Sequence, residues 1–100
     1  MKKVILSADG DSCVYEVPDA VANDLERYCL YFCTEWIRSE PQTRKYRIHG
    51  AVCYDQNDFI DYLNQYAFPN EPSRLIENLG WTNFGRDLPE AYRGTPYFNF

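Results

Sequence analysis

The sequence predicts a single α+β domain in which a small antiparallel sheet is packed by one long and one shorter helix. Three observations lead to this fold class: two β-rich runs flank a turn at the start, a long apolar stripe of helical period follows, and a shorter helical pattern lies mid-chain. A chain of 100 residues has the size of one domain and buries roughly two-thirds of its unfolded surface on folding. Its 45% hydrophobic residues are sufficient for one core.

The first elements are expected to be a β-hairpin and a long helix. The runs KKVILS and CVYEV are separated by ADGDS, and a glycine-containing turn between two such runs predicts antiparallel strands. Pro18 ends the second strand, and Asp19 is expected to cap a helix over residues 20–39. One face of this helix is apolar at steps of three and four and should be buried. Its members are Val21, Leu25, Tyr28, Cys29, Phe32, Cys33 and Trp36.

The second half of the chain predicts two further strands around a shorter helix. KYRIH alternates like a strand, and Gly50 allows the turn after it. Asp55 and Asp58 give a capping-box-like start to a helix over residues 56–67. RLIENLGW is interpreted as a strand, and one helical turn is expected at residues 88–93. The aromatic residues of the tail are expected to pack back on the body.

Within the second helix, the pattern separates a buried arc from a polar face. Phe59, Ile60, Leu63, Tyr66 and Ala67 make the predicted buried arc. The outward residues are Asn57, Asp58, Asp61, Asn64 and Gln65, with Tyr62 at the border.

Charge is segregated along the chain, whose formal net charge is −5. Residues 4–26 and 48–73 contain acids and neither lysine nor arginine, whereas residues 27–47 carry five of the ten bases. Such segregation favours a surface of one sign. The expected partner-binding residues are Tyr54, Asp55, Asp58, Asp61, Tyr62 and Glu71. Acids near a helix start are also favoured by the helix dipole alone, so a purely solvated face is the competing interpretation.

A metal site is the main alternative chemistry. Cys29, Cys33, His49 and Cys53 supply zinc-type ligands, although their spacing differs from common zinc modules. Cysteines on an apolar stripe are more often buried thiols, and free thiols are expected here. A catalytic cysteine would need a nearby base, and His49 is the only histidine of the sequence, so we expect no enzyme activity and no cofactor.

Direct nucleic-acid binding is not expected. Arg44, Lys45, Tyr46 and Arg47 form a small basic cluster, but nucleic-acid-binding domains usually have a basic footprint, and this chain is acidic. No stretch has the length of a membrane span or a signal peptide, so a cytoplasmic location is expected. Self-association through the aromatic tail PYFNF or an uncovered strand edge remains a further alternative.

In size, acidity and aromatic richness, with YDQNDFIDYLN and the acids from Asp9 to Glu26, the chain resembles small accessory proteins of phages and mobile elements. These include anti-CRISPR and anti-restriction inhibitors. The resemblance implies a non-enzymatic acidic module that occupies the basic nucleic-acid-binding surface of a bacterial defence protein. It implies no particular functional residue.

Overall fold

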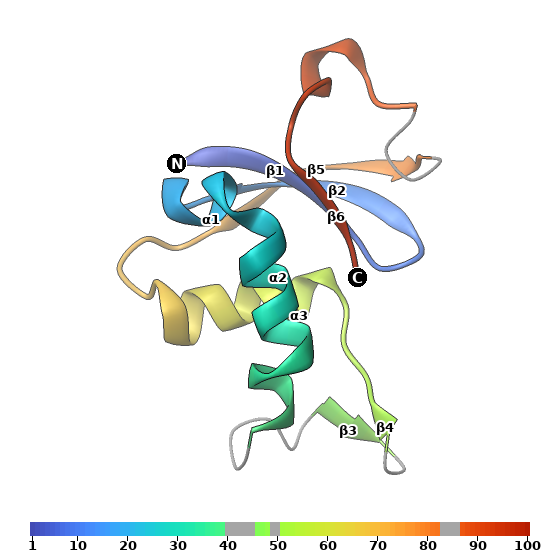
Figure 1. Cartoon of the computed structure of the whole chain (residues 1–100). Helices are drawn as coiled ribbons and strands as arrows, with labels where there is room; N and C mark the ends of the chain where they lie inside the picture. Colours follow the sequence, from blue (N-terminus) through green and yellow to red (C-terminus); the bar gives the residue numbers. More distant parts are fainter. Residues whose placement is uncertain (40–45, 49–50, 83–86) are drawn as a thin grey trace.

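The computed structural model describes residues 1–39, 46–48, 51–82 and 87–100, and it confirms the α+β class. The described residues contain a four-stranded sheet of order β5-β2-β1-β6 and a separate two-stranded ribbon, β3-β4. The helices α1, α2 and α3 all lie on one side of the larger sheet (Figure 1). None of the described helices is both long enough and apolar enough to span a bilayer.

The predicted hairpin is confirmed as β1 (Lys2–Ser7) and β2 (Asp11–Val17). Their antiparallel register runs from Lys2 opposite Val17 to Leu6 opposite Cys13. Asp9 in the connecting turn has φ 55°, a left-handed conformation that aspartate tolerates better than most residues. The turn residues therefore allow the chain to reverse between β1 and β2, as the sequence predicted.

The larger sheet is completed by two strands from the end of the chain. The predicted strand RLIENLGW is confirmed as β5 (Arg74–Trp81), which pairs antiparallel with β2. The sequence did not indicate β6 (Tyr97–Asn99), which pairs parallel with β1 and makes the sheet mixed. Three residues are too few to show an alternating pattern, so this pairing comes from tertiary contact alone.

The first helical region is interrupted, although its buried stripe lies where predicted. It comprises α1 (Asp19–Asn23), α2 (Leu25–Thr34) and the 3-10 turn η1 (Trp36–Arg38). Asp24 separates α1 from α2 with φ −145° and ψ 46°. Most of the predicted stripe is buried, while its members Tyr28 and Cys33 are half-buried.

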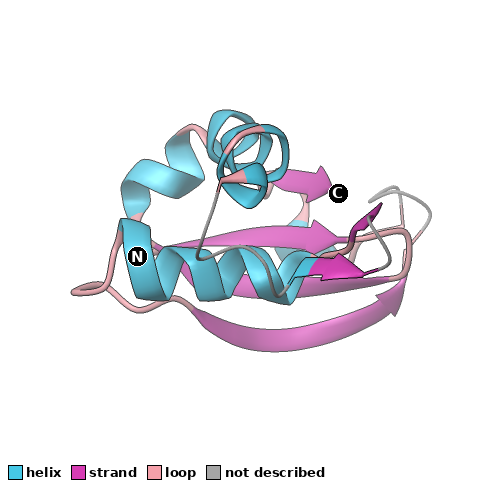
Figure 2. Cartoon of the chain, turned by 90° about the horizontal axis from the view of Figure 1, so that it is seen from below, coloured by secondary structure: helices cyan, strands magenta, loops and turns pink. Residues whose placement is uncertain are grey.

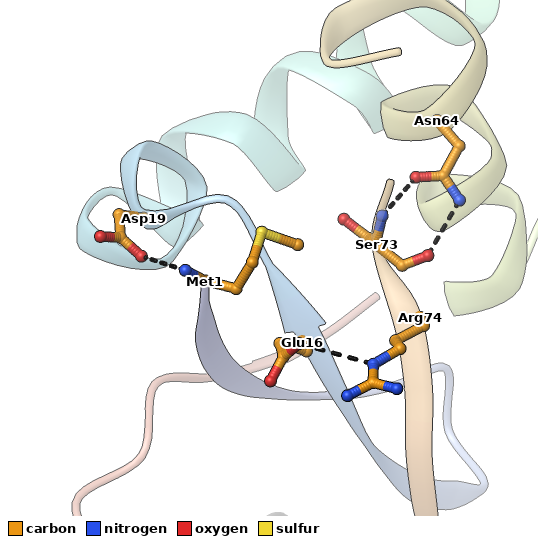
Figure 3. A network of polar contacts seen from close by, with 6 residues as sticks. All are labelled: Met1, Glu16, Asp19, Asn64, Ser73 and Arg74. Carbon is orange, nitrogen blue, oxygen red and sulfur yellow. Dashed lines mark hydrogen bonds and ion pairs between the residues drawn. The ribbon is translucent and has the colours of Figure 1, made fainter. Parts of the chain in front are cut away.

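Asp19 does not cap this region as expected. Pro18 occupies the N-cap position and makes no side-chain hydrogen bond, because proline has no polar side-chain group. The Asp19 carboxylate instead forms an ion pair of 3.0 Å with the Met1 ammonium group (Figure 3). This pair ties the start of the helical region to the start of β1.

The predicted third strand belongs to the small ribbon and not to the larger sheet. Its described part is β3 (Arg47–Ile48), which pairs with β4 (Ala51–Val52). Lys45 and His49, at either end of the predicted strand, lie outside the described residues. Tyr46 just before β3 is buried, and its ring lies 6.1 Å from that of Trp36.

The second helix has the predicted bounds but changes its winding. It begins as α3 (Gln56–Tyr62) and continues as the π-helical turn η3 (Leu63–Ala67). Within this turn, the Asn64 side-chain amide donates to the backbone carbonyl of Ser73 and accepts from its N–H, which joins the turn to the start of β5 (Figure 3). A π-turn rotates residues away from α-helical positions, and Tyr66, expected in the core, is 44% exposed.

Phe32 is the centre of the core between α2 and α3. Its ring centroid lies between 5.5 and 6.0 Å from five other aromatic centroids. These belong to Trp36, Tyr54, Phe59, Tyr62 and Phe100. The two helices cross steeply at this cluster (Figures 1 and 2). Tilted and edge-on ring contacts of this kind add to the stabilisation from burial.

The C-terminal segment covers the opposite face of the sheet and then returns to the core. It contains the 3-10 turn η5 (Glu90–Tyr92), as expected from the sequence, which lies across the sheet from the helices (Figure 1). The Lys3 ammonium lies 5.8 Å from the Tyr92 ring centroid. Phe98 and Phe100 pack against the helical core, so the expected packing of the tail aromatics is confirmed.

Replacing Phe32 with alanine should lower the free energy of unfolding by about 3–5 kcal/mol, because a fully buried ring would leave a cavity. Leu30→Ala on the same helix is the matched control, since Leu30 is 43% exposed and should change stability by less than about 1 kcal/mol. Urea unfolding followed by circular dichroism measures both. Equal losses would contradict the assignment of Phe32 as the centre of the core.

Candidate partner-binding face

The first two predicted site residues cap α3. The Asp55 carboxylate accepts hydrogen bonds from the backbone N–H groups of Asn57 and Asp58, at 2.9 and 3.1 Å. The Asp58 carboxylate in turn accepts one from the Asp55 N–H, at 2.9 Å. This reciprocal capping box confirms the predicted helix start. Both residues therefore have a structural role whether or not they also bind a partner.

The environment of Asp58 disfavours the ionised form of its carboxyl group. Partial burial raises its pKa, and the nearby charges of Asp55 and Asp61 raise it further, although the hydrogen bond from the Asp55 backbone opposes this. Among the described residues, no ion pair relieves the acids between positions 55 and 71. The start of α3 thus presents carboxylates that repel one another.

The other two predicted acids are solvent-exposed. Asp61 lies about one helical turn beyond Asp58, and Glu71 lies in the loop that leads to β5. Asp55 and Glu71 are therefore at opposite ends of the helical segment that α3 and η3 form. Asp55, Asp58 and Asp61 lie at the α3 end and Glu71 lies beyond the η3 end, so the acids do not form a single compact cluster.

The predicted tyrosines contribute less exposed surface than expected. Tyr62 is only 7% exposed, and its ring lies 4.7 Å from that of Trp36. Tyr54 is half-buried, with its ring 5.6 Å from Phe32. Both side chains pack at the crossing of α2 and α3, which the sequence pattern of one helix does not reveal. The exposed tyrosines of this region are Tyr31 and Tyr66.

Sequence reasoning also missed a shallow groove beside this face. Its volume is about 810 Å³, and α2 supplies nearly all of its lining, with Tyr62 contributed by α3. The lining residues are Asp24, Glu26, Arg27, Tyr28, Leu30, Tyr31, Thr34, Glu35 and Tyr62. Asp24, Arg27, Tyr31 and Glu35 recur at steps of three and four on the side of the helix opposite the apolar stripe, and all four are exposed. This periodic spacing was the sequence signal from which the outer side of α2, and so the groove lining, could have been found.

The described cysteines do not converge on a metal site. All four thiols are free, with Cys13 and Cys29 buried, Cys33 half-buried and Cys53 exposed. Burial raises the pKa of the Cys29 thiol, as does the neighbouring Cys33, and both effects disfavour a thiolate ligand. His49 lies outside the described residues, and within the described part no three potential ligands come together.

No protein-family model matches the sequence, and neither a curated protein nor a solved structure matches it. Two members of the basic cluster, Arg44 and Lys45, lie outside the described residues, as does the side chain of Arg47. The candidate binding face therefore consists of the described acids and tyrosines.

Removing the cap should destabilise the protein more than removing an exposed charge. Asp55→Ala is expected to lower the free energy of unfolding by about 1 kcal/mol, because two helical N–H groups lose their acceptor. Asp61→Ala should change it by less than about 0.5 kcal/mol. Denaturant titrations of the two variants test this difference. Equal stabilities would mean that the capping box contributes nothing to the fold.

Thiol labelling tests the cysteine assignments. In the native protein, iodoacetamide should modify Cys53 first, whereas Cys13 and Cys29 should react only after unfolding because they are buried. Peptide mass spectrometry identifies the modified positions, and labelling in denaturant provides the control. Protection of Cys53 on addition of zinc, without a change in Cys13, would instead favour the metal alternative.

Proposed function

We propose that the protein is a non-enzymatic binding module whose acidic helical face occupies a basic surface of another protein. The face consists of α3 with Asp55, Asp58 and Asp61, and of Glu71 beyond η3. The observation that carries the proposal is the set of carboxylates in residues 55–71 without a cation partner among the described residues. Burial is the main cause of the raised pKa of Asp58, and a basic partner would offset the repulsion from Asp55 and Asp61 that adds to it.

Several acids elsewhere in the described chain have polar partners. Asp24 forms an ion pair with Arg27, and Glu16 lies 3.5 Å from the Arg74 guanidinium (Figure 3). Asp9 and Asp11 accept hydrogen bonds from the side-chain amides of Asn99 and Asn78. The two ion pairs offset the charges of Asp24 and Glu16, whereas no described cation is paired with the α3 acids, so the α3 face is our candidate for steering a partner.

The proposed partner is a protein with a nucleic-acid-binding surface. Asp58 and Asp61 are separated by about 4.5 Å along the helix axis, a spacing loosely similar to that of a phosphate backbone. An arginine-rich groove that receives nucleic acid would be complementary to such a row of charges. This is the mode expected of the phage and mobile-element inhibitors that the sequence resembles, and a bacterial defence protein is the corresponding partner.

A second candidate is self-association through β5. This strand lies at one edge of the larger sheet, and its Leu75 and Trp81 side chains are exposed. An edge strand with exposed apolar residues can pair with another strand. The aromatic tail is a weaker candidate for the same role, because Phe98 and Phe100 already pack inside the fold. Light scattering distinguishes a dimer from the monomer.

The proposed function is tested by a charge-neutralised variant, Asp61→Asn with Glu71→Gln, which leaves the capping box intact. The matched control is Asp87→Asn with Glu90→Gln, which removes two exposed acids from the C-terminal segment. Each protein is used as bait in a bacterial lysate at low and high salt, with and without added nucleic acid. Partner identification by mass spectrometry is followed by association kinetics with the purified partner.

We expect the wild type and the control to retain a basic nucleic-acid-binding protein that salt and nucleic acid both release. The neutralised face should slow association roughly threefold to tenfold at low salt, because steering depends on the net charge of the face. Association rates that are equal for all three proteins would refute the acidic face as the binding surface.

A further inference from the structure

The groove on α2 adjoins the acidic face and has its own chemistry. Arg27, Tyr31 and Glu35 follow one another at four-residue steps along the outer side of the helix, so their side chains line one track. Tyr62 extends from α3 to the same groove, and its ring lies 6.4 Å from that of Tyr31. Tyr62 therefore connects the groove to the helix that carries the acidic face.

The groove is negatively charged and incompletely paired. It is lined by three carboxylates, Asp24, Glu26 and Glu35, and by one guanidinium, Arg27. Arg27 already forms an ion pair with Asp24. Within the described part of the chain, Glu26 and Glu35 have no ion-pair partner. A cationic occupant is therefore favoured, and a phosphate-bearing one is disfavoured.

The groove also exposes an aromatic ring to solvent. Tyr31 is 44% exposed, and Leu30 beside it is similarly exposed. The Arg27 guanidinium carbon lies 5.2 Å from the Tyr28 ring centroid, so a guanidinium already stacks on a tyrosine in this lining. Tyr31 presents a second ring of the same kind to solvent.

We infer that this groove binds an arginine side chain of the partner protein, with its guanidinium on the Tyr31 ring and hydrogen-bonded to Glu35. A planar guanidinium can stack on a ring and donate to a carboxylate at once, whereas a lysine ammonium is a strongly hydrated point charge. The groove should therefore distinguish arginine from lysine. This inference rests on the proposed function and specifies the partner surface as arginine-bearing.

The test uses two short peptides of equal length and charge, one rich in arginine and one rich in lysine. Each is titrated into the isotope-labelled full chain, and backbone amide shifts are followed by nuclear magnetic resonance. We expect the arginine peptide to bind more tightly and to shift α2 amides between Asp24 and Glu35, together with Tyr62. Equal affinity of the two peptides, or shifts confined to residues outside α2, such as the acids of α3, would overturn the inference.

Variants separate stacking from general charge. Tyr31→Ala should weaken binding of the arginine peptide about twofold to fivefold, as expected for an exposed cation–π contact. Tyr31→Phe should retain the affinity, because the ring is kept. Tyr66→Ala is the matched control, since Tyr66 is equally exposed but does not line the groove. A loss in Tyr66→Ala equal to that in Tyr31→Ala would overturn the assignment to the groove.

The failure of this inference is distinguishable from the failure of the proposed function. If the captured partner is sensitive to the Asp61 and Glu71 changes but not to Tyr31→Ala or Glu35→Gln, the groove assignment is wrong and the acidic face stands. If it is sensitive only to the groove variants, the groove assignment stands and the α3 acids are not the binding surface.

Discussion

The aromatic contact of Phe32 with the α3 side chains is the interaction on which the rest of the structure depends. Phe32 is fully buried and lies against rings from η1, α3 and the chain end. Because its side chain points inward, the preceding residue Tyr31 lies on the outer side of α2, and Glu35, four residues further on at the C-cap, is also exposed. Phe59 and Tyr62 set the rotation of α3 in the same way, which leaves Asp58 and Asp61 on its outer side. The core thereby determines which charges reach solvent.

Preorganisation links this core to binding. Tyr62 packs between Trp36 and Phe32 while it lines the α2 groove, so the junction of the groove and the acidic face is rigid. The capping box likewise holds the carboxylates of Asp55 and Asp58 in one geometry. A partner that binds there pays little ordering entropy on this side of the interface. Mutual repulsion of the carboxylates adds a favourable term when cations arrive.

Periodicity and turn chemistry predicted most of the fold. The hairpin around Asp9, the buried stripe of α2 and the Asp55 cap follow from local sequence, and each is confirmed. The break at Asp24, the π-turn after Tyr62 and the parallel strand β6 depend on tertiary contacts that no local pattern encodes. For the candidate site, the sequence supplied the acids. It missed the groove and the burial of Tyr62, because both arise where two helices cross.

The most direct test of the account is hydrogen–deuterium exchange of the protein alone and bound to a partner captured as described above. If the α2 groove and the acidic face together form the binding surface, protection from exchange should be concentrated in the amides of residues 24–35 and 55–71. The amides of β5 should be unchanged. Protection confined to β5 would contradict the account and favour strand pairing at the sheet edge. Protection over the C-terminal segment at residues 87–96 would contradict it equally, because the binding surface would then lie across the sheet from the helices.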